Sequence, residues 1–212
     1  MELSRAIRFA SLQEVADSLQ SGADPNVADQ IGCLPLGTAV SRGDIKIVKL
    51  VIEAGADVRA RNRNGNSALC QAIKFQRVDL IRLLLDHGAD IFSECDCGGV
   101  IAAATLINDP ALVEMFASMG ADVNAYNGDG FTPLMMAAGN DANDVITTLL
   151  SRGANVDLRD INGMTAYLHA ALIGNVAAGK LLRDAGANLG AITNDGLDAK
   201  ALAAENGHVW SI

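Results

Sequence analysis

The sequence predicts an all-α fold in which pairs of short antiparallel helices, joined by hairpin-like loops, stack into a solenoid. The first observation is a Gly-Ala-Asp or Gly-Ala-Asn triplet that recurs in steps of 33, 33, 32, 33 and 33 residues, with its glycine at positions 22, 55, 88, 120, 153 and 186. A second glycine series takes the same steps, at positions 32, 65, 98, 130, 163 and 196. Two markers that keep the same phase indicate a repeat array.

Each period contains the signals for two helices. In "GFTPLMMAAG", Thr132 can accept a backbone N–H of the first turn, and Pro133 takes the first helical position, where its missing N–H costs nothing. Other copies have Ser67, Thr165 or Asp198 at the capping position. A second helix with apolar spacing follows, as in "DIKIVKLVIEAG", "RVDLIRLLLDHG" and "NDVITTLLSRG", and the triplet glycine ends it. One such unit cannot bury both faces of its helices, but stacked units can.

The pattern resembles the ankyrin repeat. The family's turn, Ala-Ala pair, apolar second helix and closing triplet are found in "DQIGCLPLGTAVSRGDIKIVKLVIEAGADVRAR", "NGDGFTPLMMAAGNDANDVITTLLSRGANVDLR" and "DINGMTAYLHAALIGNVAAGKLLRDAGANLGAI". The resemblance covers essentially the whole chain and implies an ankyrin-repeat solenoid. It implies one domain over residues 1–212, divided into repeats at 1–28, 29–61, 62–94, 95–126, 127–159, 160–192 and 193–212.

Three departures from the family pattern carry expectations. The histidine of the family's Thr-Pro-Leu-His motif is absent from every copy, which puts the usual loop hydrogen bonds in doubt. In the last repeat, Asp198 replaces threonine and Lys200 replaces leucine. The fourth repeat is one residue short, and Val100 and Ile101 stand where other copies have a cap or a proline. We therefore expect its first helix to be shorter or more mobile than its neighbours.

Charge and composition exclude several classes of function. The net charge is −9, with −1 on the first 94 residues (11 basic, 12 acidic) and −8 on the rest (5 basic, 13 acidic), so a nucleic-acid partner is not expected. No signal peptide and no membrane-spanning run is visible, which predicts a cytoplasmic protein, with secretion into a host cell left open. Free thiols at Cys33, Cys70, Cys95 and Cys97 would agree with a reducing compartment.

No arrangement of residues points to chemistry. Cys95-x-Cys97 is at most half of a zinc site, and the three histidines, at positions 87, 169 and 208, are scattered. No Ser/His/Asp or Cys/His set falls on repeat positions that would meet. We therefore expect no metal, no cofactor and no enzymatic activity.

Large apolar residues follow the turn glycine in three consecutive repeats. This position has Cys33, Asn66 and Gly99 in the earlier repeats, but Phe131, Met164 and Leu197 in the later ones. Ile161 and Ile173 occupy other variable positions of the sixth repeat. The residues Phe131, Met164, Ile173 and Leu197 are predicted to form part of a partner site. The alternative is that they shield the neighbouring hairpin.

Basic residues gather in the N-terminal half. Arg59, Arg61 and Arg63 alternate along one extended stretch and so share a face. Near the ends of first helices stand Arg42, Lys74 and Arg77. The six are predicted to converge on one surface that docks an acidic peptide or phosphate group, against the alternative of a solvated basic edge.

The repeat pattern and the resemblance together predict a protein–protein interaction module. It would offer a concave recognition surface to a protein or peptide partner, as an adaptor or scaffold and as a monomer. An inhibitory subunit that blocks a partner enzyme would use the same surface and stays open. A metal-dependent or catalytic protein is the third alternative.

Overall fold

The computed structural model describes residues 3–92 and 99–212. These residues form thirteen helices and no strand, apart from one isolated antiparallel bridge between Arg61 and Ser67, so the predicted all-α fold is confirmed. The chain divides into two compact units, Met1–Asp96 and Cys97–Ile212, called unit 1 and unit 2 below. The expectation that residues 1–212 act as one domain stays a prediction.

The helices come in pairs of a short first helix and a nine-residue second helix. Unit 1 contains α1 (Leu3–Phe9), α2 (Leu12–Gln20), α3 (Pro35–Arg42), α4 (Ile45–Glu53), α5 (Ala68–Lys74) and α6 (Val78–Asp86). Unit 2 contains α7 (Val100–Leu106), α8 (Pro110–Ser118), α9 (Pro133–Gly139), α10 (Asn143–Ser151), α11 (Ala166–Leu172), α12 (Val176–Asp184) and α13 (Ala199–Glu205).

Helix starts and ends follow the local signals of the sequence. The side chains of Thr132, Ser67, Thr165 and Asp198 each accept a hydrogen bond from the backbone N–H three residues further on, so the predicted caps are confirmed. The six triplet glycines all have positive φ, between 82° and 93°, which is the left-handed conformation expected after a helix.

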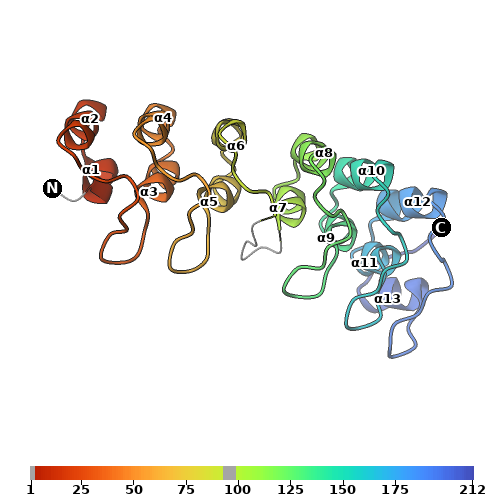
Figure 1. Cartoon of the computed structure of the whole chain (residues 1–212). Coiled ribbons are helices and arrows are strands. Elements are labelled where there is room, and N and C mark those ends of the chain that lie inside the picture. The colour runs from red at the N-terminus through yellow and green to blue at the C-terminus, as the bar shows by residue number, and fades with distance from the viewer. Residues whose placement is uncertain (1–2, 93–98) are drawn as a thin grey trace. The chain divides into compact units, whose positions relative to one another are not determined.

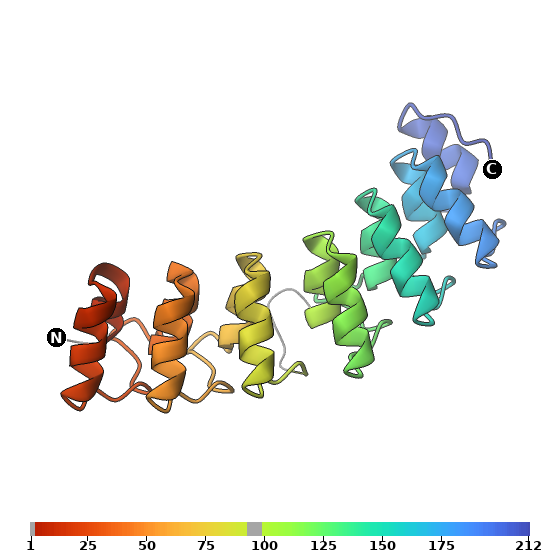
Figure 2. The same ribbon diagram turned by 90° about the horizontal axis from the view of Figure 1, so that it is seen from above.

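Within each unit the helices form two layers (Figures 1 and 2). In unit 1 the first helices α1, α3 and α5 pack side by side, and α2, α4 and α6 form the second layer. In unit 2 the first layer is α7, α9, α11 and α13, and the second is α8, α10 and α12. The core lies between the layers, with Phe116, Leu134 and Ile146 among its largest fully buried side chains. Stacking therefore buries the face that each pair leaves open.

Hairpin loops lead into the first helices and are held by the residue that opens each turn. Oδ1 of Asp29, Asn62, Asn127 and Asp160 accepts hydrogen bonds from the N–H groups two and four residues further on. The residue that directly follows Asp160 reaches the neighbouring hairpin: the Cγ2 methyl of Ile161 lies 3.3 Å from the position that a Cβ on Gly130 would occupy. The hairpins are thus ordered without the motif histidine that the family pattern provides.

Hydrogen bonds also join successive Gly-Ala-Asp or Gly-Ala-Asn segments. Asn26 accepts from the N–H of Asp57 at 2.7 Å and donates to the carbonyl of Gly55 at 3.0 Å. In unit 2, Asn124 accepts from the N–H of Asn155 at 2.8 Å, and Asp157 accepts from that of Asn188 at 2.9 Å. The repeats are therefore tied at the ends of their second helices as well as through the core.

The fourth repeat differs from what its sequence predicts. Gly99, the residue before α7, provides no side-chain cap, as expected. Yet α7 has seven residues, the same length as α5, α9 and α11, so the expectation of a shorter helix is wrong. Val100 and Ile101, which displaced the capping signal, are buried, and their burial supports the helix from the core instead.

The two cysteines among the described residues have different states. Cys33 is a free thiol, whereas Cys70 is disulfide-bonded. The expectation of free thiols is therefore wrong for Cys70, and the cysteines no longer favour a reducing compartment. Sequence spacing does not show which sulfurs meet in space. Cys95 and Cys97 lie outside the described residues.

The C-terminal segment covers the end of unit 2, where α13 has no second helix after it. Trp210 is buried, its indole N–H donates to the hydroxyl of Tyr167 at 2.9 Å, and the two rings meet edge to face at 5.4 Å. The ring approaches Gly179 inside α12 so closely that a Cβ there would lie 2.5 Å from Trp210 and closer still to Ile212. Glycine is required at this helical position by packing.

Alanine substitution of two helical glycines should change stability in opposite directions. Gly179→Ala should lower the free energy of unfolding by about 1–3 kcal/mol, because the added methyl group overpacks the contact with Trp210. Gly139→Ala, at a position with nothing within 4 Å of the new Cβ, should raise it by up to about 1 kcal/mol through helix propensity. Urea unfolding followed by circular dichroism measures both, and equal effects would contradict the packing argument.

Hydrogen exchange tests the missing cap of α7. A lost cap typically costs about 1 kcal/mol, so backbone amides of residues 100–108 should exchange before those of residues 132–138, where Thr132 caps the helix. Native-state exchange with mass spectrometry measures the order. Equal or better protection of the α7 amides would mean that the burial of Val100 and Ile101 fully replaces the cap.

Candidate functional site

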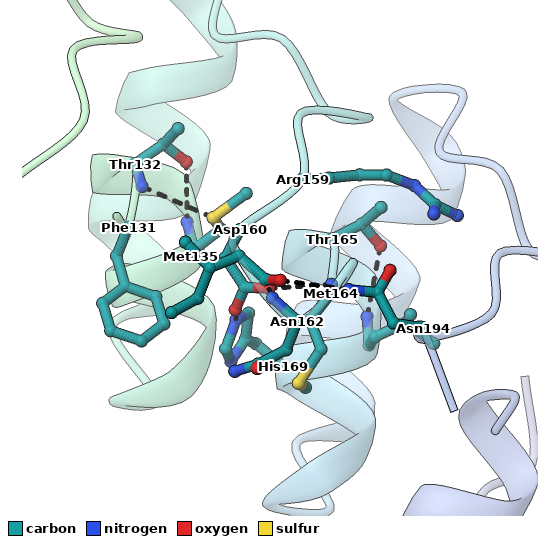
Figure 3. A network of polar contacts seen from close by, with 12 residues as sticks. Phe131, Thr132, Met135, Arg159, Asp160, Asn162, Met164, Thr165, His169 and Asn194 are labelled. Carbon is teal, nitrogen blue, oxygen red and sulfur yellow. Dashed lines mark hydrogen bonds and ion pairs between the residues drawn. The ribbon is translucent and has the colours of Figure 1, made fainter. Parts of the chain in front are cut away.

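A polar network with one aromatic neighbour lies where the sixth repeat enters α11 (Figure 3). The Asp160 side chain is fully buried, and its Oδ1 accepts from the N–H groups of Asn162 and Met164 at 2.8 and 2.9 Å. Its Oδ2 lies 2.9 Å from Nε2 of His169. The His169 imidazole in turn meets the Phe131 ring edge to face, with centroids 5.4 Å apart. The network therefore links the hairpins and first helices of two consecutive repeats.

The charge state of His169 is set by its burial. Burial lowers the pKa of His169 below its ordinary value, and the hydrogen bond and charge of Asp160 oppose this without overcoming it. A carboxylate can only accept, so the neutral imidazole carries its hydrogen on Nε2 and donates it to Asp160. The neutral imidazole of His169 thus donates a hydrogen bond to the buried carboxylate of Asp160. This hydrogen bond orders the hairpin and offers no proton relay to another side chain of the network.

The structure places three of the four predicted apolar residues at least partly at the surface. Phe131 and Leu197 are half-buried, and Ile173 is 36% exposed. Met164 is only 8% exposed, so the expectation that it forms part of an accessible surface is wrong. The agreement of three repeats in sequence thus corresponds to two half-buried side chains and one buried one.

Other apolar residues are more exposed than those that the sequence singled out. Ile161, named only as an additional candidate, is 78% exposed at its hairpin tip, and Leu106, at the end of α7, is 54% exposed. The sequence reasoning missed Leu106 because it examined the hairpin positions. The signal that would find it is its place as the last residue of a first helix, the place that Leu172 takes in α11.

The six basic residues belong to different segments of unit 1. Arg61 and Arg63 precede α5, whereas Lys74 and Arg77 lie at and beyond its end, a separation of about 10 Å along a seven-residue helix. Arg59 is elsewhere, because its Nε donates to the carbonyl of Gly88 at 2.9 Å. These separations do not test whether the long side chains meet, so the basic docking surface in unit 1 stays a prediction.

The charged ends of several of these residues bind the main chain. Nη1 of Arg42 donates to the carbonyls of Ile7 and Ala10, at 2.6 and 2.7 Å, at the end of α1. The guanidinium of Arg77 lies against Gly43, and the Arg63 side chain lies over Gly32. Within the part of the chain that the structure describes, no ion pair with Asp or Glu involves any of the six. They act partly as ties between repeats.

The described residues provide neither a metal-binding cluster nor a membrane-spanning helix. Among them, no group of three or more His, Cys, Asp or Glu side chains is arranged to hold a metal ion. Likewise, none of their helices has the length and apolar character needed to cross a bilayer. The Cys95-x-Cys97 pair lies outside the described residues.

Acid should destabilise the region around His169. The unfolded chain takes up the proton at the ordinary pKa, about 6.5, while the folded chain takes it up only at lower pH. The contribution of neutral His169 to the free energy of unfolding is therefore fully present above about pH 6.5 and falls as the pH drops below that value. Urea unfolding between pH 7.5 and 5.5 should show a smaller loss for His169→Gln than for the wild type. Identical pH slopes would mean that His169 does not contribute.

Comparisons with known proteins agree on the fold. A family model described as ankyrin repeats (3 copies) matches residues 3–95 and 100–193. The human transient receptor potential cation channel subfamily A member 1 is 35% identical over 66 residues, which are 31% of this chain and only 6% of that protein. The chain thus spans a small part of this relative.

Two solved structures are similar over nearly their whole length. The ankyrin repeat domain of Bcl-3, described as a unique member of the IκB protein family, matches with a TM-score of 0.78 and 23% identity, over 96% of this chain and 93% of that one. The ankyrin repeat domain of human ASB11 matches with a TM-score of 0.80 and 24% identity, over 96% and 91%. At these identities the likeness shows the fold alone.

Proposed function

The chain belongs to the ankyrin repeat family, and we propose that it binds a protein or peptide partner through the first-helix layer and hairpins of unit 2. Ankyrin repeat domains are generally protein–protein interaction modules without catalytic function. The role proposed for this chain is that of an adaptor or scaffold that acts as a monomer. A cytoplasmic location remains part of the proposal.

The observation that supports this surface is its exposed apolar side chains on an ordered backbone. Ile161 is 78% exposed and Ile173 is 36% exposed. Phe131 and Leu197, which follow the turn glycines of the preceding and following repeats, are half-buried. Contiguous exposed apolar surface tends to mark a partner site. The hydrogen bonds of Asn127 and Asp160 already hold the hairpins, so little conformational entropy is lost when a partner binds.

Two other roles follow from the same surface or from unit 1. An inhibitory subunit that blocks a partner enzyme would need the same apolar side chains, so it is the alternative. The exposed cations Arg61 and Lys74 remain candidates for contacts with an acidic segment. No arrangement of the described residues supports a catalytic role.

The double variant Phe131→Ala and Ile161→Ala should lose partner binding and remain folded. Removing the ring costs about 1 kcal/mol through its edge-to-face contact with His169, while affinity should fall by a factor of about 10 or more if these are anchor residues. Affinity capture with mass spectrometry, followed by titration of the captured protein, gives both values. Met119→Ala, at an exposed position at the end of α8, is the matched control and should retain binding. Equal binding by all three proteins would contradict the proposed surface.

A further inference from the structure

The first helices of unit 2 end in a row of matching positions. The helices α7, α9 and α11 each have seven residues, and α9 packs against both of the others. Their last residues are Leu106, Gly139 and Leu172, and the residues that follow as C-caps are Ile107, Asn140 and Ile173. The row therefore alternates between an apolar pair, an open place and a second apolar pair.

The two apolar pairs are accessible, and the place between them is empty of side chain. Leu106 is 54% exposed and Ile173 36%, while Ile107 and Leu172 are half-buried. A Cβ on Gly139 would meet nothing within 4 Å, so the backbone of α9 is open to a close approach there. Two apolar ridges thus flank a notch whose floor is the end of α9.

Asn140 adds an unused polar group to the notch. It is exposed, and its side-chain amide makes no hydrogen bond with the described residues, although its backbone N–H donates to the carbonyl of Ala137. A carboxamide has both donors and an acceptor. It can therefore bond to the N–H and C=O groups of an extended peptide backbone that crosses the notch.

The charges of unit 2 favour a partner segment that carries positive charge. Its five basic residues lie away from the row: Arg152, Lys180 and Arg183 belong to the second layer, Arg159 donates to the carbonyl of Ile192, and Lys200 lies near the start of α13. Acidic residues border the row, since Asp141 follows Asn140 and the exposed Glu205 ends α13 at the position matching Leu172. Because α13 packs beside α11, Glu205 continues the row with a negative charge.

We propose that this row binds an extended peptide segment that carries two apolar side chains six residues apart and a Lys or Arg beyond one of them. The apolar side chains contact Leu106 with Ile107 and Leu172 with Ile173, the backbone crosses Gly139, and the basic residue faces Glu205. The assignment rests on the proposed function and names the partner chemistry for part of that surface.

The spacing follows from helix packing. Adjacent packed helices lie about 8–10 Å apart, so the two apolar pairs are separated by roughly 16–20 Å. An extended chain rises about 3.3 Å per residue, so this distance corresponds to about five or six residues. Side chains on one face of an extended chain are separated by even numbers, which selects six. One further helix spacing of about 8–10 Å corresponds to about two or three residues. The same even-number rule selects two, and the long side chain of Lys or Arg spans the remaining distance to Glu205.

Selection from an unbiased peptide library displayed on phage, with the whole 212-residue chain as bait, tests the assignment. Selected peptides should carry apolar residues six apart and a Lys or Arg two residues beyond one of them, and their affinity should fall as salt rises. Gly139→Lys fills the notch and adds a positive charge at a helical position with open space, so it should reduce the affinity at least tenfold without loss of stability. Thr147→Lys, which adds the same charge at an exposed position of α10, should change the affinity less than twofold.

The outcomes separate this inference from the proposed function. Peptides with the stated spacing that bind the wild type and not Gly139→Lys support both. Peptides that bind Gly139→Lys as well as the wild type, but lose affinity for the Phe131→Ala and Ile161→Ala variant, overturn the row as the site and leave the proposed function standing. Failure to select any peptide that binds saturably overturns the peptide-binding proposal in both forms.

Discussion

Within each unit the repeats depend on their neighbours, because a helix pair of seven or eight plus nine residues cannot bury its own apolar faces. Phe116, Leu134 and Ile146 come from three consecutive helices of unit 2 and are all fully buried. The same dependence governs polar groups. Asn124 and Asp157 satisfy N–H groups of the following repeat, not their own. The sequence therefore repeats because each unit must fit the units beside it, as well as form its own two helices.

Local signals predicted the fold well because they act within a few residues. The caps at Thr132 and Thr165 bond to N–H groups three residues away, and the triplet glycines need only their own φ angle. The absent motif histidine put the loop hydrogen bonds in doubt. The structure shows that Asn127 and Asp160, at the opening of the turn, carry those bonds instead. The histidine hydrogen bonds of the family motif are therefore replaced by Asx hydrogen bonds within the same hairpin, and the Asn and Asp residues that make them are visible in the sequence.

Features that depend on a neighbouring repeat were not predictable in the same way. The burial of Met164 and the binding of Arg59 to the carbonyl of Gly88 depend on side-chain direction and on residues about one repeat away. Alternation along an extended stretch predicts a shared face only if the stretch is a regular strand, and residues 59–63 form none. Leu106 was missed for a related reason: its exposure becomes meaningful only when the ends of α7, α9 and α11 are compared. The helices and the phase of the repeats could be predicted from local residues, whereas the exposure of each side chain depends on the repeats packed beside it.

The packing of Trp210 on Gly179 also gives the molecule a built-in optical probe. Trp210 is the only tryptophan in the chain, and it sits buried at the extreme repeat of unit 2 with its N–H on Tyr167. Its fluorescence therefore reports on that end alone, whereas far-ultraviolet circular dichroism averages over all helices. Because the stability of a repeat array is a sum of unit and nearest-neighbour terms, end repeats have fewer stabilising interfaces than central ones. Comparing the two signals during unfolding distinguishes fraying from the C-terminal end from a cooperative loss of the whole array, with no label added to the protein.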